Sequence, residues 1–462
     1  MPEAQEPKDY PPRTNALSTL MDKVYFHRLP SYANKIFYGL GFLALTCLVL
    51  LAASGILMAF MGQAWWLHNP WGVYVRSVHL WTVQAFIAIL ILHMLVAFTT
   101  SAFKPPRRMV WVFGATILCL AFITTEFGYG LRGDFSSQFR AVSGADFWNG
   151  SFLGWWINPL SSLQDFAIHT MIIPFIILAL FVLHYLLERT YGISKPYRSD
   201  IKYKMVAANH TVMYVRGIVL VAAIAVLAFF FHSPYVPAVT IEGVATQQPA
   251  LVEQTLTDEY NRTSDTATYL DSIDPYTFDT RQVYILEPYQ QLAASSFATS
   301  STSTPDLATM IAAIMPATRS GLYQSLLDSE DPAPETYTLR FLNDMDVLEA
   351  KAGTLGFDTE QSGMAKDENG HLLGLPPGSW WLTPLAVLNS TFNLPANPNG
   401  DFIAAETLGF IMLIFIAFPY IPYLNRLPEL LHLAPFIWKE PRSKEKHEPG
   451  EGCNSKAISY IS

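Results

Sequence analysis

Four histidines stand in matched pairs in two long apolar segments of the sequence. His79 and His93 are 14 residues apart, and His169 and His184 are 15 residues apart. At 100° per residue, these spacings return to within about 40° and 60° of the starting direction and span about 21–22 Å along a helix axis. Each segment, as a helix, would therefore present two imidazoles on one face, at two depths.

Two neutral imidazoles that face each other across a helix bundle form a bis-axial ligand set for haem iron. We expect His79 and His169 to bind one haem at an outer level, and His93 and His184 to bind a second at an inner level. A zinc or di-iron site would call for histidines three or four residues apart together with carboxylates, a pattern that the two segments do not provide. For any single histidine, the alternative is a packed core residue.

Four glycines repeat the histidine spacing in two other apolar segments. Gly41 and Gly55 are 14 residues apart, as are Gly114 and Gly128. Glycine inside a helix costs up to about 1 kcal/mol relative to alanine. The close approach of a porphyrin edge to the backbone would explain that cost, and small-residue packing between membrane helices is the alternative.

Basic residues flank the expected sites. Arg76 precedes His79 by one helical turn, Lys104 and Arg107 follow His93, and Arg189 follows His184. Guanidinium and ammonium groups at these points would pair with haem propionates. Anchoring of the helix ends at the membrane surface is the alternative.

The elements that must position these residues are membrane helices. Of 462 residues, 51% are hydrophobic and only 15% are charged. Uncharged windows, each about long enough to cross a hydrocarbon core of roughly 30 Å, cover 36–61, 77–103, 109–125, 166–187, 217–241 and 407–425. This pattern excludes a soluble enzyme, a nucleic-acid binder and a disordered protein. It predicts an all-α membrane protein: a four-helix di-haem bundle, about two further transmembrane helices and an extracytoplasmic insertion.

Lysine and arginine are concentrated on one side of the predicted bilayer. With the N-terminus inside, the inner segments hold 20 of the 29 basic residues and the outer segments hold 9. The positive-inside rule therefore predicts a multi-pass protein of the cell (inner or cytoplasmic) membrane with cytoplasmic N- and C-termini. No cleavable signal peptide is visible, and the three cysteines form no CxxCH haem-attachment motif.

The predicted organisation has six parts. They are a cytoplasmic N-terminal segment (1–35), the di-haem domain (36–200), a fifth transmembrane helix (201–232), an acidic extracytoplasmic domain (233–401), a sixth transmembrane helix (402–425) and a cytoplasmic tail (426–462). The acidic domain, which we expect to be mostly irregular and helical, has a net charge of −16, whereas the rest of the chain has +7. Its surface would either steer a basic partner, such as a soluble cytochrome, or simply aid solubility.

The stretches KIFYGLGFLALTC, YVRSVHLW, FKPPR, TEFGYGL and LHYLLERTYGISKP resemble the cytochrome b/b6 family of the cytochrome bc1 and b6f complexes. The resemblance covers residues 25–200, and the 15-residue spacing is similar to that of the b6 branch. It implies two b haems, a homodimer in a multi-subunit complex, and oxidation of quinol. One electron would pass to a Rieske iron–sulfur protein and then to a c-type cytochrome or another acceptor, and the other would pass inward to a quinone.

Departures from the family pattern change some expectations. Gly39 stands where cytochrome b6 has a haem-binding cysteine, so no covalent haem c is expected. Gln164 replaces a usual arginine, and Arg132 is a substitute partner for a propionate. The family's Pro-Glu-Trp-Tyr motif is missing, and the nearest echo is RQVYILEPY, in which Tyr284 and Glu287 would serve the quinol pocket. The alternative for Glu287 is an ordinary loop carboxylate.

Two redox functions remain open from the sequence. In the first, the chain is the di-haem electron-transfer subunit of a quinol–cytochrome c (or other acceptor) oxidoreductase. In the second, it is a di-haem membrane anchor that links the quinone pool to a different extracytoplasmic oxidoreductase, such as a molybdoenzyme. A non-redox transporter or structural protein is a third hypothesis, which predicts a protein without haem.

Overall fold

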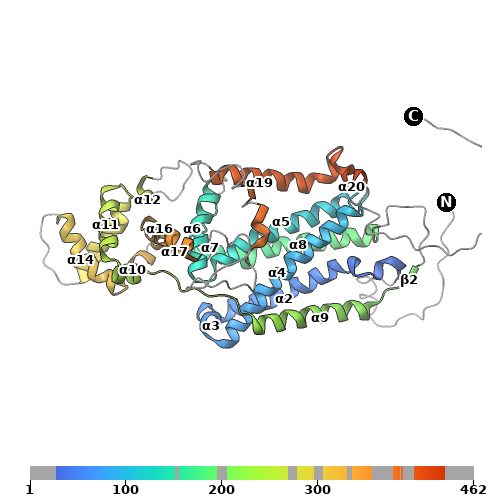
Figure 1. The fold of residues 1–462 in the computed structure, drawn as a ribbon, viewed down its shortest axis with the longest axis horizontal. Coiled ribbons are helices and arrows are strands. Elements are labelled where there is room, and N and C mark those ends of the chain that lie inside the picture. The colour runs from blue at the N-terminus through green and yellow to red at the C-terminus, as the bar shows by residue number, and fades with distance from the viewer. Residues whose placement is uncertain are drawn as a thin grey trace, which may run out of the picture.

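A computed structural model describes residues 28–150, 156–194, 205–268, 278–295, 305–329, 336–355, 378–384, 387–388 and 400–431. The tail from 432 onwards and most of the N-terminal segment lie outside these ranges. Long parallel and antiparallel helices form one end of the elongated molecule, and a group of short helices forms the other (Figure 1). The expected all-α membrane architecture is confirmed.

Among the described residues, five helical segments are long and apolar enough to cross a membrane. They are α2 (Leu40–Met61), α4 (Pro70–Thr99), α5 (Arg108–Gly130), a fourth segment over Ser162–Tyr191, and α9 (His210–Phe230). The fourth segment comprises α7 (Ser162–Ala167), a π-helical turn η3 (Ile168–Ile172) and α8 (Ile173–Tyr191). Large apolar side chains on these helices remain exposed, among them Phe60, Phe175 and Ile218. An apolar exterior of this kind is what lipid covers.

The predicted sixth span is bent. Helix α19 (Gly400–Ala417) runs into the 3₁₀ turn η8 (Phe418–Tyr420), and the next pieces are η9 (Leu424–Arg426) and α20 (Leu427–Leu430). The two halves of this pair differ in direction by 67°. Pro419 and Pro422 lack a backbone N–H, which accounts for the break within the sixth transmembrane helix predicted over 402–425.

Local signals set the ends of the spans. The Asn69 side chain accepts hydrogen bonds from the backbone N–H groups of Trp71 (2.9 Å) and Gly72 (3.4 Å) at the start of α4, and Pro70 occupies its first position. Gly62 (φ +82°) ends α2 and Gly192 (φ +72°) ends α8, in backbone conformations that favour glycine.

The bundle core packs around α4 and α5. Fully buried side chains there include Ile87, Phe103 and Ala115. The Trp81 Nε1 donates to the Phe231 carbonyl (2.9 Å) and so ties α4 to the end of α9, while the Trp111 Nε1 donates to the Phe415 carbonyl (2.9 Å) and ties α5 to α19. These contacts assemble the six apolar elements into one body.

Shorter elements connect and cover the bundle. A two-stranded antiparallel ladder pairs β1 (Arg28–Pro30) with β2 (Met205–Ala207), with Leu29 opposite Val206. The turns η1 (Ser31–Asn34) and η2 (Ile36–Tyr38) lead into α2, and α3 (Gln63–His68) separates α2 from α4. Helix α6 (Phe135–Gly150) and the turn η6 (Trp380–Leu382) lie at the end of the bundle that faces the short helices.

The short helices form a second hydrophobic unit, which we call the helical domain. It comprises α10 (Ile241–Gln247), α11 (Pro249–Asn261), α12 (Asp265–Thr268), the π-helical turn η4 (Gln282–Leu286), α13 (Glu287–Ser295), α14 (Leu307–Arg319), α15 (Leu322–Asp328), α16 (Thr336–Asp344) and α17 (Val347–Leu355). Its core includes fully buried Tyr284, Tyr323 and Phe341, and it also contacts α6 through Phe135. The described part of the acidic insertion is therefore an ordered helical body.

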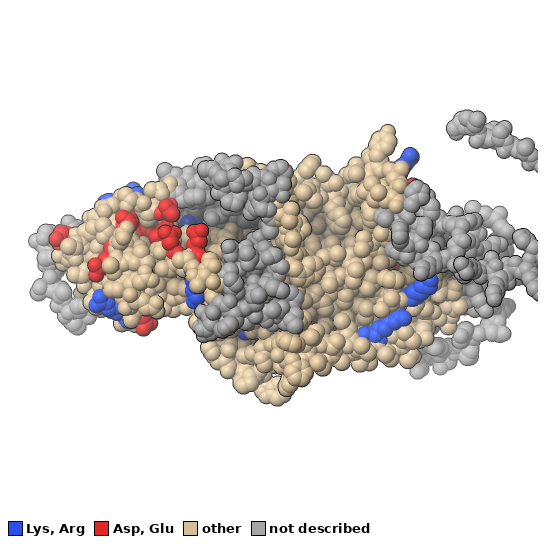
Figure 2. Space-filling view, in the orientation of Figure 1, with Lys and Arg blue, Asp and Glu red and all other residues tan. Residues whose placement is uncertain are grey.

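Charge follows this division of the molecule. On the face shown in Figure 2, the visible acidic side chains gather on the helical domain together with some basic ones, the tan surface of the middle is almost uncharged, and basic side chains lie toward the opposite end of the bundle. The uncharged belt coincides with the five spanning helices (Figure 1). The protein is therefore a multi-pass membrane protein.

Candidate cofactor site in the helix bundle

Two pairs of histidines lie between helices of the bundle, and in each pair the two side chains face each other. One member of each pair lies on α4, and the other lies on α8 or on the turn η3 that precedes it. The ring centroids of His79 and His169 are 6.3 Å apart, and those of His93 and His184 are 6.4 Å apart. We call the first the domain-side pair, because it lies toward the helical domain, and the second the far-side pair. The predicted matching of depth is thus present in the structure.

These separations match two imidazoles bound to one metal ion from opposite sides. A metal–imidazole bond is about 2.0–2.1 Å, and a ring nitrogen lies about 1.1 Å from its ring centre, so collinear ligation separates the two centroids by about 6.2–6.4 Å. Edge-to-face ring pairs also have centroids about 4.5–7 Å apart, so the hydrogen bonds at Nδ1 and the glycine clearances, rather than the separation alone, favour ligation over simple ring packing. The space between each pair therefore fits a metal centre.

The Nδ1 atoms of three histidines are held by α2 and α5. Ser54 Oγ lies 2.9 Å from His79 Nδ1, and because the same hydroxyl donates to the Leu50 carbonyl (2.7 Å), it accepts from the imidazole N–H. His169 Nδ1 donates to the Thr124 carbonyl (2.8 Å) and His184 Nδ1 to the Val110 carbonyl (2.9 Å). A proton fixed on Nδ1 leaves the Nε2 lone pair free for a metal.

The π-helical turn explains why the two helices have unequal histidine spacing. His169 lies in η3 (Ile168–Ile172), whose wider turn accommodates one residue more than an α-helix. The 15 residues between His169 and His184 therefore cover the same interval as the 14 residues in α4. A π-helical turn of this kind often occurs at a functional site.

All four predicted glycines lie against the histidine rings. A Cβ at Gly41 would be 3.7 Å from His93 Cε1, and at Gly55 it would be 3.4 Å from His79 Cε1. At Gly114 it would be 3.1 Å from His184 Cε1, and at Gly128 only 2.6 Å from His169 Cε1. The absence of side chains at these glycines thus leaves room for the imidazole rings. The clearance is smallest between Gly128 and the ring of His169.

Two arginines at the domain-side end have unused hydrogen-bond donors. Arg76 is 7% exposed, and its Nη2 donates to the Ser233 carbonyl (3.0 Å), whereas its Nε and Nη1 are buried without a partner among the described residues. Arg132 pairs with Asp134 (2.8 Å) and donates to the Pro234 carbonyl (2.5 Å), and its Nε is likewise unpaired. Buried, unpaired guanidinium donors indicate that an anionic group belongs beside them.

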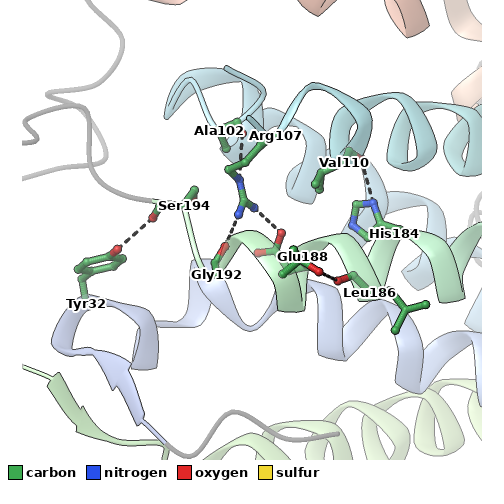
Figure 3. Close-up of polar contacts among 10 residues, drawn as sticks. Tyr32, Ala102, Arg107, Val110, His184, Leu186, Glu188, Gly192 and Ser194 are labelled. Atoms are coloured by element: carbon green, nitrogen blue, oxygen red, sulfur yellow. Dashed lines mark hydrogen bonds and ion pairs between the residues drawn. The ribbon is translucent and has the colours of Figure 1, made fainter. Parts of the chain in front are cut away.

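Arg107 and Lys104 at the far-side end instead have partners within the protein, although Arg108 Nε there is buried without a partner among the described residues. All three nitrogens of Arg107 have partners, namely the Ala102 carbonyl, the Gly192 carbonyl and the Glu188 carboxylate (Figure 3). Lys104 forms an ion pair with Glu429. We therefore assign neither cation to a propionate. Arg189 is partly buried one residue beyond Glu188 and stays a prediction.

Tyr284 and Glu287 lie in the helical domain rather than beside the histidines. Burial raises the pKa of Tyr284 well above its usual range, and its hydroxyl donates to the Tyr337 carbonyl (3.0 Å). Glu287 accepts from Gln282 Nε2 (3.0 Å). Since Tyr284 is fully buried and serves packing, we do not carry this pair forward as a quinol site.

The segment around η6 contacts the bundle in a way that the sequence did not reveal. Trp380 Nε1 donates to Gln84 Oε1 (2.8 Å), and Gln84 Nε2 donates to the Gly378 carbonyl (3.2 Å). Arg140 Nη2 donates to Ser379 Oγ (3.0 Å). A buried glutamine in the middle of an apolar helix was the available signal, because such a side chain needs a polar partner.

The donor set, the clearance at the glycines and the unpaired arginine donors fit an iron porphyrin at each level. Bis-imidazole ligation is an established arrangement of haem iron in helix bundles. Facing rings alone would suit other metals, but the described residues contain no group of three or more His, Cys, Asp or Glu side chains that could hold an ion. A cofactor with its own in-plane ligands is therefore the better fit.

Comparison with known proteins identifies the family. Residues 84–243 match the cytochrome b (N-terminal)/b6/petB family model. Cytochrome b6 of Heliobacterium modesticaldum (strain ATCC 51547 / Ice1) is 31% identical over 192 residues, which cover 37% of this chain and 90% of that protein. Cytochrome b6 of Mastigocladus laminosus is 29% identical over 208 residues, covering 39% and 94%.

A chain of a solved structure described as a hyperthermophilic respiratory Complex III aligns with 73% of this chain and 94% of its own length, at 17% identity and a TM-score of 0.40. The family match begins after His79 but includes His93, His169 and His184, and it ends where the helical domain begins. The family model thus matches the part of the helical bundle from the second half of α4 to α9, which holds three of the four histidines. The chain belongs to the cytochrome b/b6 family of membrane electron-transfer proteins.

Proposed function

We propose that the chain is the di-haem cytochrome b subunit of a quinol-oxidising electron-transfer complex. The observation that carries the proposal is the pair of facing imidazoles at two levels, with centroid separations of 6.3 Å and 6.4 Å. A b haem at each level would supply a one-electron carrier within the bilayer. His79 and His93 are 14 residues apart on α4, so the two levels are about 21 Å apart along the axis.

The protein's own residues prepare the two levels. Ser54, Thr124 and Val110 hold the Nδ1 protons of His79, His169 and His184, which presents each Nε2 to the iron and raises the basicity of the ligand. The apolar bundle core excludes water, which sets a low dielectric constant around both levels.

Arg76 and Arg132 would bind carboxylates of the domain-side haem. Their unpaired buried donors and their position one turn or one loop from the domain-side pair support this role. Arg76 lies three residues before His79, on the same face of α4. Arg132 already pairs with Asp134 (2.8 Å), whereas Arg76 forms no ion pair that short among the described residues, and a buried guanidinium with unpaired donors is unfavourable, which is a physical reason to expect a ligand beside Arg76.

The charge distribution supports an orientation with the far-side end and both termini in the cytoplasm. Lys104, Arg107 and Arg108 lie in the far-side loop, and the acidic helical domain lies beyond the other end. Short cytoplasmic loops are enriched in Lys and Arg. We propose that the helical domain is extracytoplasmic and that a Rieske protein and a cytochrome c, or another acceptor, dock on that side of a homodimeric complex.

Purification of the native complex tests the proposal. We expect quinol to reduce the b-type absorption of the chain, a Rieske subunit to co-purify, and a c-type cytochrome to be reduced in a reaction that quinol-pocket inhibitors block. Co-purification of a molybdenum-containing subunit without a Rieske protein would instead establish the anchor function. A preparation in which quinol does not reduce the haem would contradict both functions.

A further inference from the structure

An ionic contact joins the start of α5 to the end of α8 at the far side of the bundle. Arg107, the residue that precedes α5, donates through Nη2 to Glu188 and through Nη1 to the Gly192 carbonyl, which follows α8. Its Nε donates to the Ala102 carbonyl at 3.2 Å. The two charged side chains are 13% and 26% exposed. A planar guanidinium that donates to three acceptors fixes both the distance and the relative orientation of the segments that carry them.

The same two helix ends hold His184. Glu188 follows His184 by four residues, so the two side chains lie one turn apart on the same face of α8. Val110, whose carbonyl accepts from His184 Nδ1 at 2.9 Å, follows Arg107 by three residues in the first turn of α5. The ion pair and the imidazole hydrogen bond are thus successive links between the last two turns of α8 and the start of α5 (Figure 3).

The domain-side pair is held differently. His169 bonds to Thr124 from within a π-helical turn, well inside α5. The ion pair of Arg140 with Glu126 (3.4 Å) joins α6 to α5, and that of Arg132 with Asp134 joins residues next to the start of α6. Neither ion pair includes a residue of α8. A substitution of Arg107 should therefore affect the far-side histidine pair and not the domain-side pair.

We propose that Arg107 and Glu188 form a positioning clamp that holds His184 in ligating orientation and so controls the far-side haem separately from the domain-side haem. The inference rests on the proposed di-haem function. Without the clamp, the last turn of α8 can move away from the first turn of α5, which lengthens the bond between His184 and Val110. A ligating histidine that loses its outer hydrogen bond typically loses about 10- to 100-fold in metal affinity.

Three variants and one control test the clamp in the full complex. Arg107→Ala removes all three contacts, Arg107→Lys keeps the charge but not the fork, and Glu188→Gln keeps the size but not the charge. Lys104→Ala is the control, because it removes a positive charge from the same loop and breaks an ion pair with Glu429 that does not involve α8. The readouts are haem retained per polypeptide, the redox titration and the electron paramagnetic resonance signal of each ferric haem.

The variants of Arg107 and of Glu188 together distinguish loss of His184 positioning from a purely electrostatic effect on the haem potential. Removing the Arg107 charge favours the ferric haem and lowers the far-side midpoint potential, whereas neutralising Glu188 raises it. Positioning predicts the same direction for both: far-side haem retention falls about tenfold and its ferric signal shifts. Arg107→Lys should retain less far-side haem than wild type and more than Arg107→Ala. If Arg107→Ala does not fold, Arg107→Lys and Glu188→Gln together provide the test.

The clamp is overturned if Arg107→Ala and Glu188→Gln leave far-side retention and its ferric signal unchanged, if both haems are lost equally, or if Lys104→Ala has the same effect. Amide hydrogen exchange of residues 186–192 provides a readout without haem, and we expect faster exchange in Arg107→Ala than in Lys104→Ala. A wild-type chain without two haems would refute the proposed function, and the exchange measurement would still show whether the clamp exists.

Discussion

Gly128→Ala should remove the domain-side haem while leaving the far-side haem in place. A Cβ at this position would lie 2.6 Å from His169 Cε1, 3.0 Å from Nδ1 and 3.2 Å from Nε2. Carbon atoms pack best at about 3.5–4.0 Å, so the ring must move by about 1 Å. Because Thr124 fixes Nδ1, the displacement tilts Nε2 away from His79.

The size of the effect follows from the cost of overpacking. Inserting one methyl group into a filled core typically costs about 1–3 kcal/mol, which corresponds to about a 5- to 150-fold weaker retention of the cofactor. At the other glycines, the expected effect of alanine is weaker where the added Cβ would lie farther from the histidine ring. Gly41→Ala meets His93 at an ordinary contact distance of 3.7 Å and should keep both haems.

The assay is haem content per polypeptide with the reduced-minus-oxidised absorption spectrum. Gly409→Ala is the matched control, because Gly409 lies in α19 with no atom within 4 Å of the added Cβ. We expect it to keep both haems and to gain up to about 1 kcal/mol of helix stability. Normal haem content in Gly128→Ala, or haem loss in Gly409→Ala, would refute the reasoning.

Three further outcomes are expected. Ser54→Ala should weaken domain-side haem retention about 10- to 100-fold by removing the Nδ1 acceptor of His79, with the loss measured by haem content. Arg76→Ala should lower the domain-side midpoint potential, measured by redox titration, and an unchanged potential would contradict a haem beside Arg76. Burial, and after it the neighbouring Asp344, raises the pKa of Glu259 well above its usual range, so the stability that the protonated Glu259 contributes to the helical domain should be fully present below its unfolded-state pKa and be lost as the pH rises toward the raised, folded-state pKa. Glu259→Gln should flatten this dependence in hydrogen exchange of α11 and α16, and an equally steep dependence in the variant would contradict it.

The histidine pairs and the glycines could be predicted because helix periodicity is local. Spacings of 14 and 15 residues place side chains on one face whatever surrounds the helix. The π-helical turn at His169 could not be predicted, since it depends on how backbone and neighbours share one additional residue. The 67° bend in the last apolar stretch was missed although two prolines mark it.

The roles of the arginines depend on tertiary contacts and were harder to predict. Arg76 and Arg107 both flank a histidine helix in the sequence, yet only Arg76 retains unpaired donors, while Arg107 meets Glu188 and Gly192. The packing of the helical domain, which we expected to be mostly irregular and helical, also depends on tertiary contacts between residues far apart in the sequence, such as Tyr284 and Tyr337. Tyr284, which the sequence suggested for a quinol pocket, is a fully buried core residue of this domain.

Haem stoichiometry in single-histidine variants tests the account most directly. The wild-type chain should carry two b haems, His93→Ala should lose only the far-side haem, and His79→Ala only the domain-side haem. The exposed His68 in α3 provides the control, and His68→Ala should keep both. A colourless wild-type chain, or a His93→Ala variant that keeps both haems, would contradict the two-level ligation on which the proposed function depends.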